Sequence, residues 1–207
     1  MTQPSPSLLT HCDFRVGYGP SDDRLHTFYI PALQASVRYD RMTGFFTSNA
    51  LAIAAAGIAH LITNGGTMRL LVGAQLARQD VEAIRRGHDP RDVVAPQFEA
   101  ALPDSEALTD HLMRDRLGAL AWMIAKGTLT IRVVLPKGPD GLPLPAPEAR
   151  DYFHPKVGIF TDAQGHQVAF SGSVNESETA WAHNYEQFMV FTSWGPAKIY
   201  VTESVGR

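Results

Sequence analysis

The segment FHPKVGIF, at residues 153–160, decides both the fold class and the chemistry that we expect of this chain. Its apolar second half predicts a β-strand. His154 and Lys156 flank Pro155, so on a strand their side chains lie on the same face. An imidazole and an ammonium group are thereby placed within reach of one ligand.

A second polar segment, FSGSVNES at residues 170–177, follows after a turn at residues 162–165. We expect residues 167–171 to pair with the first strand as a hairpin. The small residues beyond this strand predict a turn, on which Ser173 and Asn175 share a face. The turn adds a hydroxyl and an amide to the imidazole and the ammonium group, and the four groups together suit a bound phosphate.

These groups match the needs of phosphodiester cleavage without a metal ion: a nucleophile, an acid for the leaving oxygen and donors for the phosphate oxygens. A neutral His154 can attack phosphorus, and Lys156 supplies positive charge. Ser173 and Asn175 supply neutral donors. Glu186, on the next expected strand, is placed to hold the other ring nitrogen of His154. The predicted catalytic residues are therefore His154, Lys156, Ser173, Asn175 and Glu186.

One such set contains a single imidazole, whereas attack and protonation of the leaving oxygen require two. A two-fold dimer that brings two copies of His154 together would supply both, so we expect a homodimer with its active site across the axis. We expect no metal ion and no cofactor. Cys12 is the only cysteine, which excludes an internal disulfide and a cysteine-based zinc site.

The overall composition is that of a globular chain with mild charge. The 207 residues suffice for one well-buried domain, and the net charge of −3 excludes a uniformly basic coat for nucleic acid while allowing a local basic cleft. The N-terminus lacks a basic region followed by an apolar core, and no apolar run approaches about 18 residues. We therefore expect no secretory signal, no membrane partner and a cytoplasmic location.

Strands and helices alternate along the chain, which predicts an α/β layered fold. Residues 1–20 are expected to be an N-terminal arm and residues 21–207 the domain, with a proline-rich surface loop at residues 136–150. The expected strands are residues 35–39, 67–72, 128–135, 153–161, 167–171 and 186–192. The expected helices are a short one within residues 22–35, one from Ser48 or Asn49 to Thr63, and others at residues 79–86, 104–125 and 175–181.

The pattern H-x-K, followed by G-S-x-N and a downstream glutamate, resembles that of the phospholipase D superfamily, whose members carry HKD motifs. This resemblance implies a phospholipase D-like fold, with a mixed β-sheet flanked by helices. It also implies a covalent phosphohistidine intermediate, no metal ion and two motifs in each active site. By the same resemblance, His154 is the nucleophile or the acid and Glu186 orients it. The implied phosphate ligands are Lys156, Ser173 and Asn175.

One position departs from the superfamily pattern H-x-K-x4-D. The pattern requires aspartate at position 161, where this chain has Thr161, and Asp162 follows one residue later. A degenerate site that binds phosphate without cleaving is therefore one alternative. Another is a purely structural role, in which His154 is an ordinary strand histidine and the serine and asparagine cap a helix.

A narrower likeness involves mainly the N-terminal half of the chain. Residues 29–33, 36–46, 65–73 and 184–186 are similar to the phospholipase D-like domain that precedes bacterial superfamily 2 (Swi/Snf-type) helicases. The likeness implies that the substrate is DNA and that the chain works with a helicase in antiviral defence or DNA processing. No G-x-x-x-x-G-K-[ST] loop is present, so ATP hydrolysis would belong to a separate domain or subunit.

Further substrate contacts are expected outside the catalytic set. Arg38 and Arg41, beside aromatic residues, are placed either to touch a DNA backbone or to form surface ion pairs with Asp40. Ser171 and Gly172, just before the polar turn, are the other candidates.

The sequence therefore predicts a homodimeric, metal-independent DNA endonuclease. The rival prediction is a catalytically degenerate DNA-binding or docking module of a helicase system, which Thr161 and the modest net charge favour. A lipid phosphodiesterase would use the same chemistry, but the sequence shows no amphipathic membrane helix and no second motif.

Overall fold

The computed structural model describes residues 8–47, 50, 53–74, 82, 86, 123–149 and 152–206. Two of the expected helices, at residues 79–86 and 104–125, lie mostly outside the described residues, as does the expected helix start at Ser48 or Asn49.

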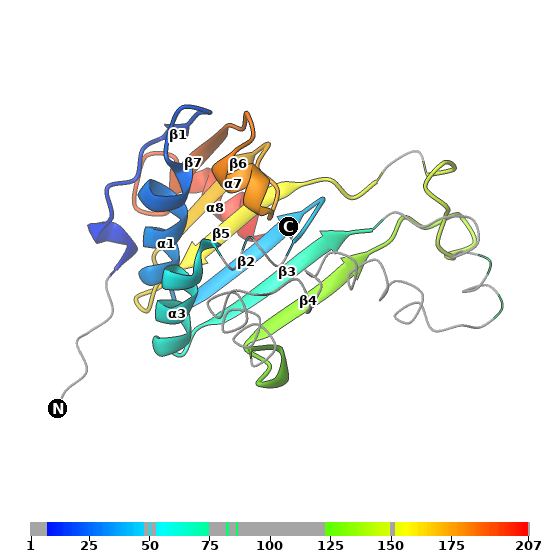
Figure 1. The fold of residues 1–207 in the computed structure, drawn as a ribbon, viewed down its shortest axis with the longest axis horizontal. Helices are drawn as coiled ribbons and strands as arrows, with labels where there is room; N and C mark the ends of the chain where they lie inside the picture. Colours follow the sequence, from blue (N-terminus) through cyan, green and yellow to red (C-terminus); the bar gives the residue numbers. More distant parts are fainter. Residues whose placement is uncertain are drawn as a thin grey trace, which may run out of the picture.

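In the described part of the chain, seven strands form one mixed sheet in the order β1-β7-β6-β5-β2-β3-β4 (Figure 1). Their bounds are β1 Gly17–Tyr18, β2 Arg38–Thr43, β3 Thr67–Gly73, β4 Leu129–Val134, β5 Lys156–Thr161, β6 Gln167–Gly172 and β7 Phe188–Thr192. Strands β2, β3 and β4 run parallel, whereas the β2–β5 pair and the pairs from β5 to β1 are antiparallel. The α/β fold class with a mixed sheet is thus confirmed.

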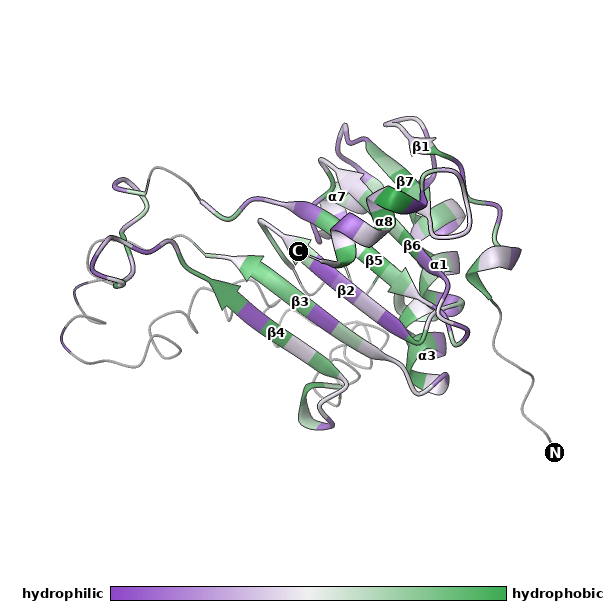
Figure 2. Ribbon diagram, turned by 180° about the vertical axis from the view of Figure 1, so that it is seen from behind, coloured by the Kyte–Doolittle hydropathy of each residue, from purple (hydrophilic) through white to green (hydrophobic). Residues whose placement is uncertain are grey.

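Helices lie on both faces of the sheet. A π-helical turn, η2 (Leu25–Tyr29), continues into α1 (Ile30–Gln34), which packs against α3 (Ala55–Thr63) on one face. On the other face α8 (Lys198–Val205) crosses β5, β6 and β7, as Figure 2 shows. The other helices within the described ranges are the 3-10 turn η1 (Leu9–His11) and α7 (Glu178–Ala182).

The strand predicted at residues 35–39 begins later than expected. Ala35 ends α1, and the Ser36 hydroxyl donates to the carbonyl of Ala32 at 2.6 Å, so both residues belong to the end of the helix. The strand itself starts at Arg38.

Alternating side chains give the sheet two different faces. On β2, Tyr39, Arg41 and Thr43 are buried, and we call their side of the sheet the front face. It carries the aromatic core, whose buried members include Phe28, Tyr29, Tyr39, Phe160, Phe170, Trp181 and Phe188. The opposite side, which carries Arg38, Asp40 and Met42, is the reverse face.

The N-terminal arm packs into this core. Leu9 and Tyr18 are buried, and β1 pairs with the edge of β7. The Tyr18 ring stacks on Phe188 with a centroid distance of 5.0 Å. Residues 8–20 therefore contribute both a strand and core side chains to the domain.

None of the helices in the described ranges combines the length and the hydropathy that a membrane span requires.

Candidate active site

His154 and Lys156 lie at one end of the sheet, where several chain segments converge. Lys156 opens β5 directly opposite Thr43, the last residue of β2. His154 precedes it in an extended segment and is exposed to solvent. The strand prediction therefore holds for Lys156, and its side chain points to the front face with that of Thr43.

The two predicted catalytic side chains contact each other. Lys156 Nζ lies 2.7 Å from Nε2 of His154 and also donates to the His154 carbonyl oxygen at 3.2 Å. A protonated lysine has no acceptor, so Nε2 presents its lone pair and the ring proton resides on Nδ1. This is the tautomer in which Nε2 can act as a nucleophile.

Electrostatics favour the neutral imidazole. Partial burial, followed by the neighbouring charge of Lys156, lowers the pKa of His154 below its ordinary value. Burial and the charge of Arg41 lower the pKa of Lys156, and the carboxylate of Glu186 partly opposes this shift. Two cations and one carboxylate therefore act on this small region together with the imidazole.

Two glycines that the sequence analysis missed make room for the histidine segment. A Cβ atom on Gly44 would overlap Nδ1 of His154 and lie 3.2 Å from its Cε1. A Cβ atom on Gly73 would overlap the carbonyl oxygen of Phe153. Both glycines lie at or just beyond the ends of the parallel strands β2 and β3, so bare backbone there lets residues 153–154 pass close to the sheet.

Ser173 is tied to the start of β7. Its hydroxyl accepts from the Gln187 amide at 3.0 Å and donates to the Gln187 carbonyl at 3.3 Å. The hydroxyl proton is thus already engaged, and a phosphate would have to replace the carbonyl as its acceptor.

Asn175 lies beside the pair through Thr43. Its Oδ1 accepts from the Thr43 hydroxyl at 3.4 Å, and Thr43 faces Lys156 across the β2–β5 register. Among the described residues, Asn175 Nδ2 makes no hydrogen bond.

Glu186 is almost fully buried and takes a different partner from the one predicted. Its Oε1 accepts from Asn184 Nδ2 at 3.3 Å. Within the described ranges no hydrogen bond joins it to His154, and its recorded electrostatic effect falls on Lys156. The orienting role toward His154 stays a prediction.

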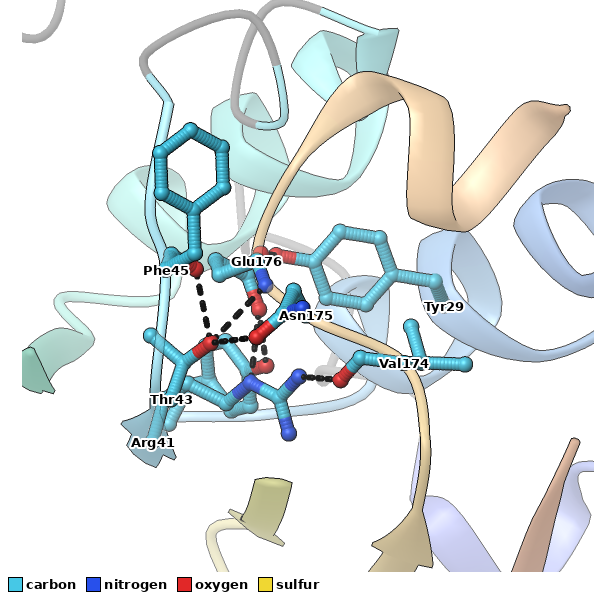
Figure 3. A network of polar contacts seen from close by, with 8 residues as sticks. Tyr29, Arg41, Thr43, Phe45, Val174, Asn175 and Glu176 are labelled. Atoms are coloured by element: carbon cyan, nitrogen blue, oxygen red, sulfur yellow. Dashed lines mark hydrogen bonds and ion pairs between the residues drawn. The ribbon is translucent and has the colours of Figure 1, made fainter. Parts of the chain in front are cut away.

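Arg41 is buried, which is at odds with the predicted contact to substrate. Its Nε donates to Glu176 Oε2 at 2.8 Å, and Nη2 donates to the Val174 carbonyl (Figure 3). Neither side chain of this ion pair is exposed to solvent. Arg41 thus supports the fold of the turn that carries Asn175 and forms neither the predicted surface ion pair nor a surface contact.

Glu176, which the sequence analysis did not single out, is the centre of this buried cluster. Its carboxylate accepts from the hydroxyls of Tyr29 and Tyr39, the latter at 3.0 Å. Burial and the charge of Glu176 raise the pKa of both tyrosines. Its backbone amide donates to the Thr43 hydroxyl at 3.0 Å, which fixes the turn against β2.

The other substrate-contact candidates lie in different places. Arg38 is at the far end of β2, on the reverse face, and its Nε donates to Asp40 Oδ2 at 2.6 Å. Five residues of strand separate it from Thr43, or roughly 17 Å. Ser171 and Gly172 are exposed at the end of β6, close to Ser173.

The position where the superfamily pattern requires aspartate is remote from His154. Thr161 ends β5, and the buried Asp162 accepts from the amides of Gln164 and His166, each at 2.9 Å. It also accepts from the Leu9 amide at 3.1 Å. Because Lys156 and Asp162 lie roughly 20 Å apart along the strand, the departure at position 161 removes no side chain from the candidate site.

The described ranges contain no group of three or more histidine, cysteine, aspartate or glutamate side chains placed to hold an ion.

Comparison with known proteins yields structural likeness only. No protein-family model and no curated protein matches the sequence. The phosphatidylserine synthase of Haemophilus influenzae matches with a TM-score of 0.50 and 15% identity, over 91% of this chain and 36% of its own. NucT from Helicobacter pylori matches with a TM-score of 0.45 and 14% identity, over 92% of this chain and 94% of its own. Nuc from Salmonella typhimurium, a phospholipase D family member, gives a TM-score of 0.35 and 14% identity, over 86% and 84% of the two chains.

Proposed function

We propose that this chain, which shares the fold of phospholipase D superfamily members, is a metal-independent phosphodiesterase that cleaves DNA through a covalent intermediate on His154. The observation that carries the proposal is the 2.7 Å contact between Lys156 Nζ and His154 Nε2 at a solvent-exposed end of the sheet. Attack on a phosphodiester requires at least a nucleophile and a positive charge for the phosphate oxygens, and the imidazole lone pair and the neighbouring cation supply these.

The first step would be displacement at phosphorus. An entering phosphate replaces Nε2 as the acceptor of Lys156 Nζ, which frees the lone pair to form the N–P bond. Asn175 Nδ2 donates to a second phosphate oxygen. The P–O bond to the leaving oxygen breaks, and that oxygen takes a proton from the protonated imidazole of a second copy of His154.

The second step would return both imidazoles to their starting states. The second imidazole, now neutral, takes a proton from water as the water oxygen attacks phosphorus. The N–P bond breaks and a phosphomonoester leaves. Because a single chain offers one such histidine, the proposal requires a homodimer. Exposure of His154 supports it, since a second copy can approach the ring.

The choice of DNA as substrate and of a helicase as partner rests on the sequence likeness of residues 29–33, 36–46, 65–73 and 184–186. One observation favours the rival function, a DNA-binding module without cleavage. Ser173 is bonded to Gln187 and Glu186 to Asn184, so two of the five predicted catalytic groups have other partners.

Cleavage of a fluorescent DNA in EDTA separates the two functions. The parent should cleave, and His154→Ala should lose at least about 10³-fold in rate while still binding DNA. His183→Ala, which changes an exposed histidine at the end of α7, is the matched control and should cleave like the parent. Denaturation in alkaline detergent, which preserves an N–P bond, should trap labelled protein from the parent and not from His154→Ala. Equal cleavage by parent and His154→Ala would exclude the nuclease proposal, and binding without cleavage by the parent would establish the rival.

A further inference from the structure

The reverse face of the sheet holds a basic cavity that the proposed chemistry does not use. It measures about 370 Å³ and is lined by side chains of β2, β3, β4 and β5, with the end of α8 as one wall. In Figure 2, α8 lies in front of β5 to β7, and the ribbons of β2, β3 and β4 beside it, which no helix covers in this view, include hydrophilic positions. We call this site the reverse-face pocket.

Positive charge is in excess in the reverse-face pocket. Its charged side chains on this face are Arg38, Arg69, Arg132 and Asp40, three cations against one anion, whereas the whole chain carries −3. Arg38 Nε lies 2.6 Å from Asp40 Oδ2, and Arg69 Nε pairs with the other oxygen of the same carboxylate. Asp40 is 20% exposed, against 46% and 57% for these two arginines. The carboxylate therefore lies below the guanidinium groups and anchors them through Nε.

The terminal nitrogens of these arginines remain available. No hydrogen bond is recorded for the Nη groups of Arg38 and Arg69, or for Arg132, among the described residues. A guanidinium held by its Nε and open at its Nη atoms is suited to a phosphate oxygen.

The register of the strands sets the arginines in a diagonal row. On β3, Arg69 lies opposite Asp40, which is two residues after Arg38 on β2. On β4, Arg132 lies opposite Leu71, which is two residues after Arg69 on β3. With strands about 4.8 Å apart and about 3.3 Å per residue, successive arginines are roughly 8 Å apart. Level with Arg132 and to one side of this row, Leu71, Met42 and Val157 form an apolar strip across β3, β2 and β5. A cationic row beside an apolar strip suits the phosphates and bases of an extended single strand.

One end of the reverse-face pocket adjoins the candidate active site. Met42 pairs with Val157 on the reverse face, and the next pair along the same two strands is Thr43 with Lys156 on the front face. A strand that is cut at His154 can therefore continue over the end of the sheet into the pocket.

We propose that the reverse-face pocket binds the backbone of single-stranded nucleic acid through Arg38, Arg69 and Arg132. The choice of DNA as the ligand rests on the proposed function. The test measures binding alone and needs no cleavage. The probe is a fluorescent oligothymidylate of about 20 nucleotides, titrated by anisotropy in a His154→Ala background. Failure of the nuclease proposal therefore leaves this test intact.

The double variant Arg69→Ser/Arg132→Ser should bind at least about tenfold more weakly, and the slope of log affinity against log salt should fall by about 1.4, since each lost contact contributes roughly 0.7. The control Arg15→Ser/Arg86→Ser removes equal charge from exposed arginines elsewhere and should leave affinity and slope nearly unchanged. Arg69→Lys/Arg132→Lys should keep most of the salt slope, which separates lost charge from lost folding.

Three results would overturn the inference. Equal losses in the serine variant and its control would mean that only net charge matters. Unchanged binding by the serine variant would exclude the pocket. Deoxythymidine monophosphate that competes as well as the oligonucleotide would identify a small-ligand site.

Discussion

The cluster around Glu176 and the pair formed by His154 and Lys156 are neighbours on the front face of the sheet. They differ in burial and in saturation, by which we mean how many hydrogen-bond partners the central polar group already has. Glu176 is fully buried and accepts from the side chains of Tyr29, Tyr39 and Arg41. His154 is exposed, and among the described residues its Nε2 contacts one ammonium group, that of Lys156.

The difference teaches which polar groups can react. A buried charge without partners costs several kcal/mol, and the Glu176 carboxylate already accepts from three side chains, so it is not available to a substrate. An exposed pair can exchange its partner for a phosphate at little cost. The saturated cluster holds the turn in place, and under the proposed function the unsaturated pair meets the substrate.

The largest expected effect concerns Lys156. Lys156→Met should lower the rate of DNA cleavage by about 10³-fold, because it removes the charge that faces the phosphate, while the free energy of unfolding changes by less than about 0.5 kcal/mol. Lys137→Met, a change at an exposed loop lysine, is the control for rate and for urea unfolding. A large loss of stability in Lys156→Met would show that the pair is structural after all.

Glu176→Gln tests the saturated cluster. The variant leaves the Arg41 guanidinium buried without its anion. The free energy of unfolding, measured in urea, should therefore fall by about 3–5 kcal/mol. Glu203→Gln, on an exposed position of α8, should change stability by less than about 0.5 kcal/mol. Equal stability of the two variants would mean that the ion pair contributes nothing to the fold.

A smaller effect is expected at the glycine that borders the histidine. Gly44→Ala should displace the His154 ring and reduce cleavage by about 10²-fold, because small misplacements of a reacting group are costly. The fold should survive, since the atoms displaced belong to a surface side chain. In the control Gly19→Ala, the nearest atom to the new Cβ among the described residues, Asp22 Oδ2, lies 3.7 Å away, so cleavage should match that of the parent. Normal cleavage by Gly44→Ala would show that the ring position is not critical.

The smallest expected effect concerns the pKa of His154. The pKa of His154 is lowered by burial and by Lys156, so the imidazole should stay neutral to a lower pH than an ordinary histidine. As pH falls through that pKa, the nucleophile is lost and cleavage should decline. Folding then also becomes less favourable, since the unfolded chain binds the proton more readily. In Lys156→Met, imidazole NMR titration should find a higher pKa, and an unchanged value would exclude the charge effect.

Local sequence signals predicted the framework of the site. The hairpin around residues 162–165 and the placement of Lys156 on a strand followed from alternation and turn residues. Alternation also held information about the arginines. Arg38 and Arg41 are an odd number of residues apart on one strand, so their side chains must face opposite sides of the sheet.

Local sequence signals could not predict the buried cluster around Glu176. Tyr29, Tyr39 and Arg41 lie 147, 137 and 135 residues from Glu176 in the sequence, so only the folded sheet brings them together. The same holds for Gly44, whose need for a bare backbone comes from His154, a residue distant in the sequence that precedes β5.

The arm at the start of the chain has a practical consequence. Leu9 is hydrogen-bonded to Asp162, and Tyr18 stacks on Phe188 beside the short strand that flanks β7. A protein trimmed at residue 20 would present β7 as an open edge next to an uncovered aromatic surface. That combination promotes strand-to-strand association between molecules, so the trimmed form should aggregate where the full chain stays dispersed.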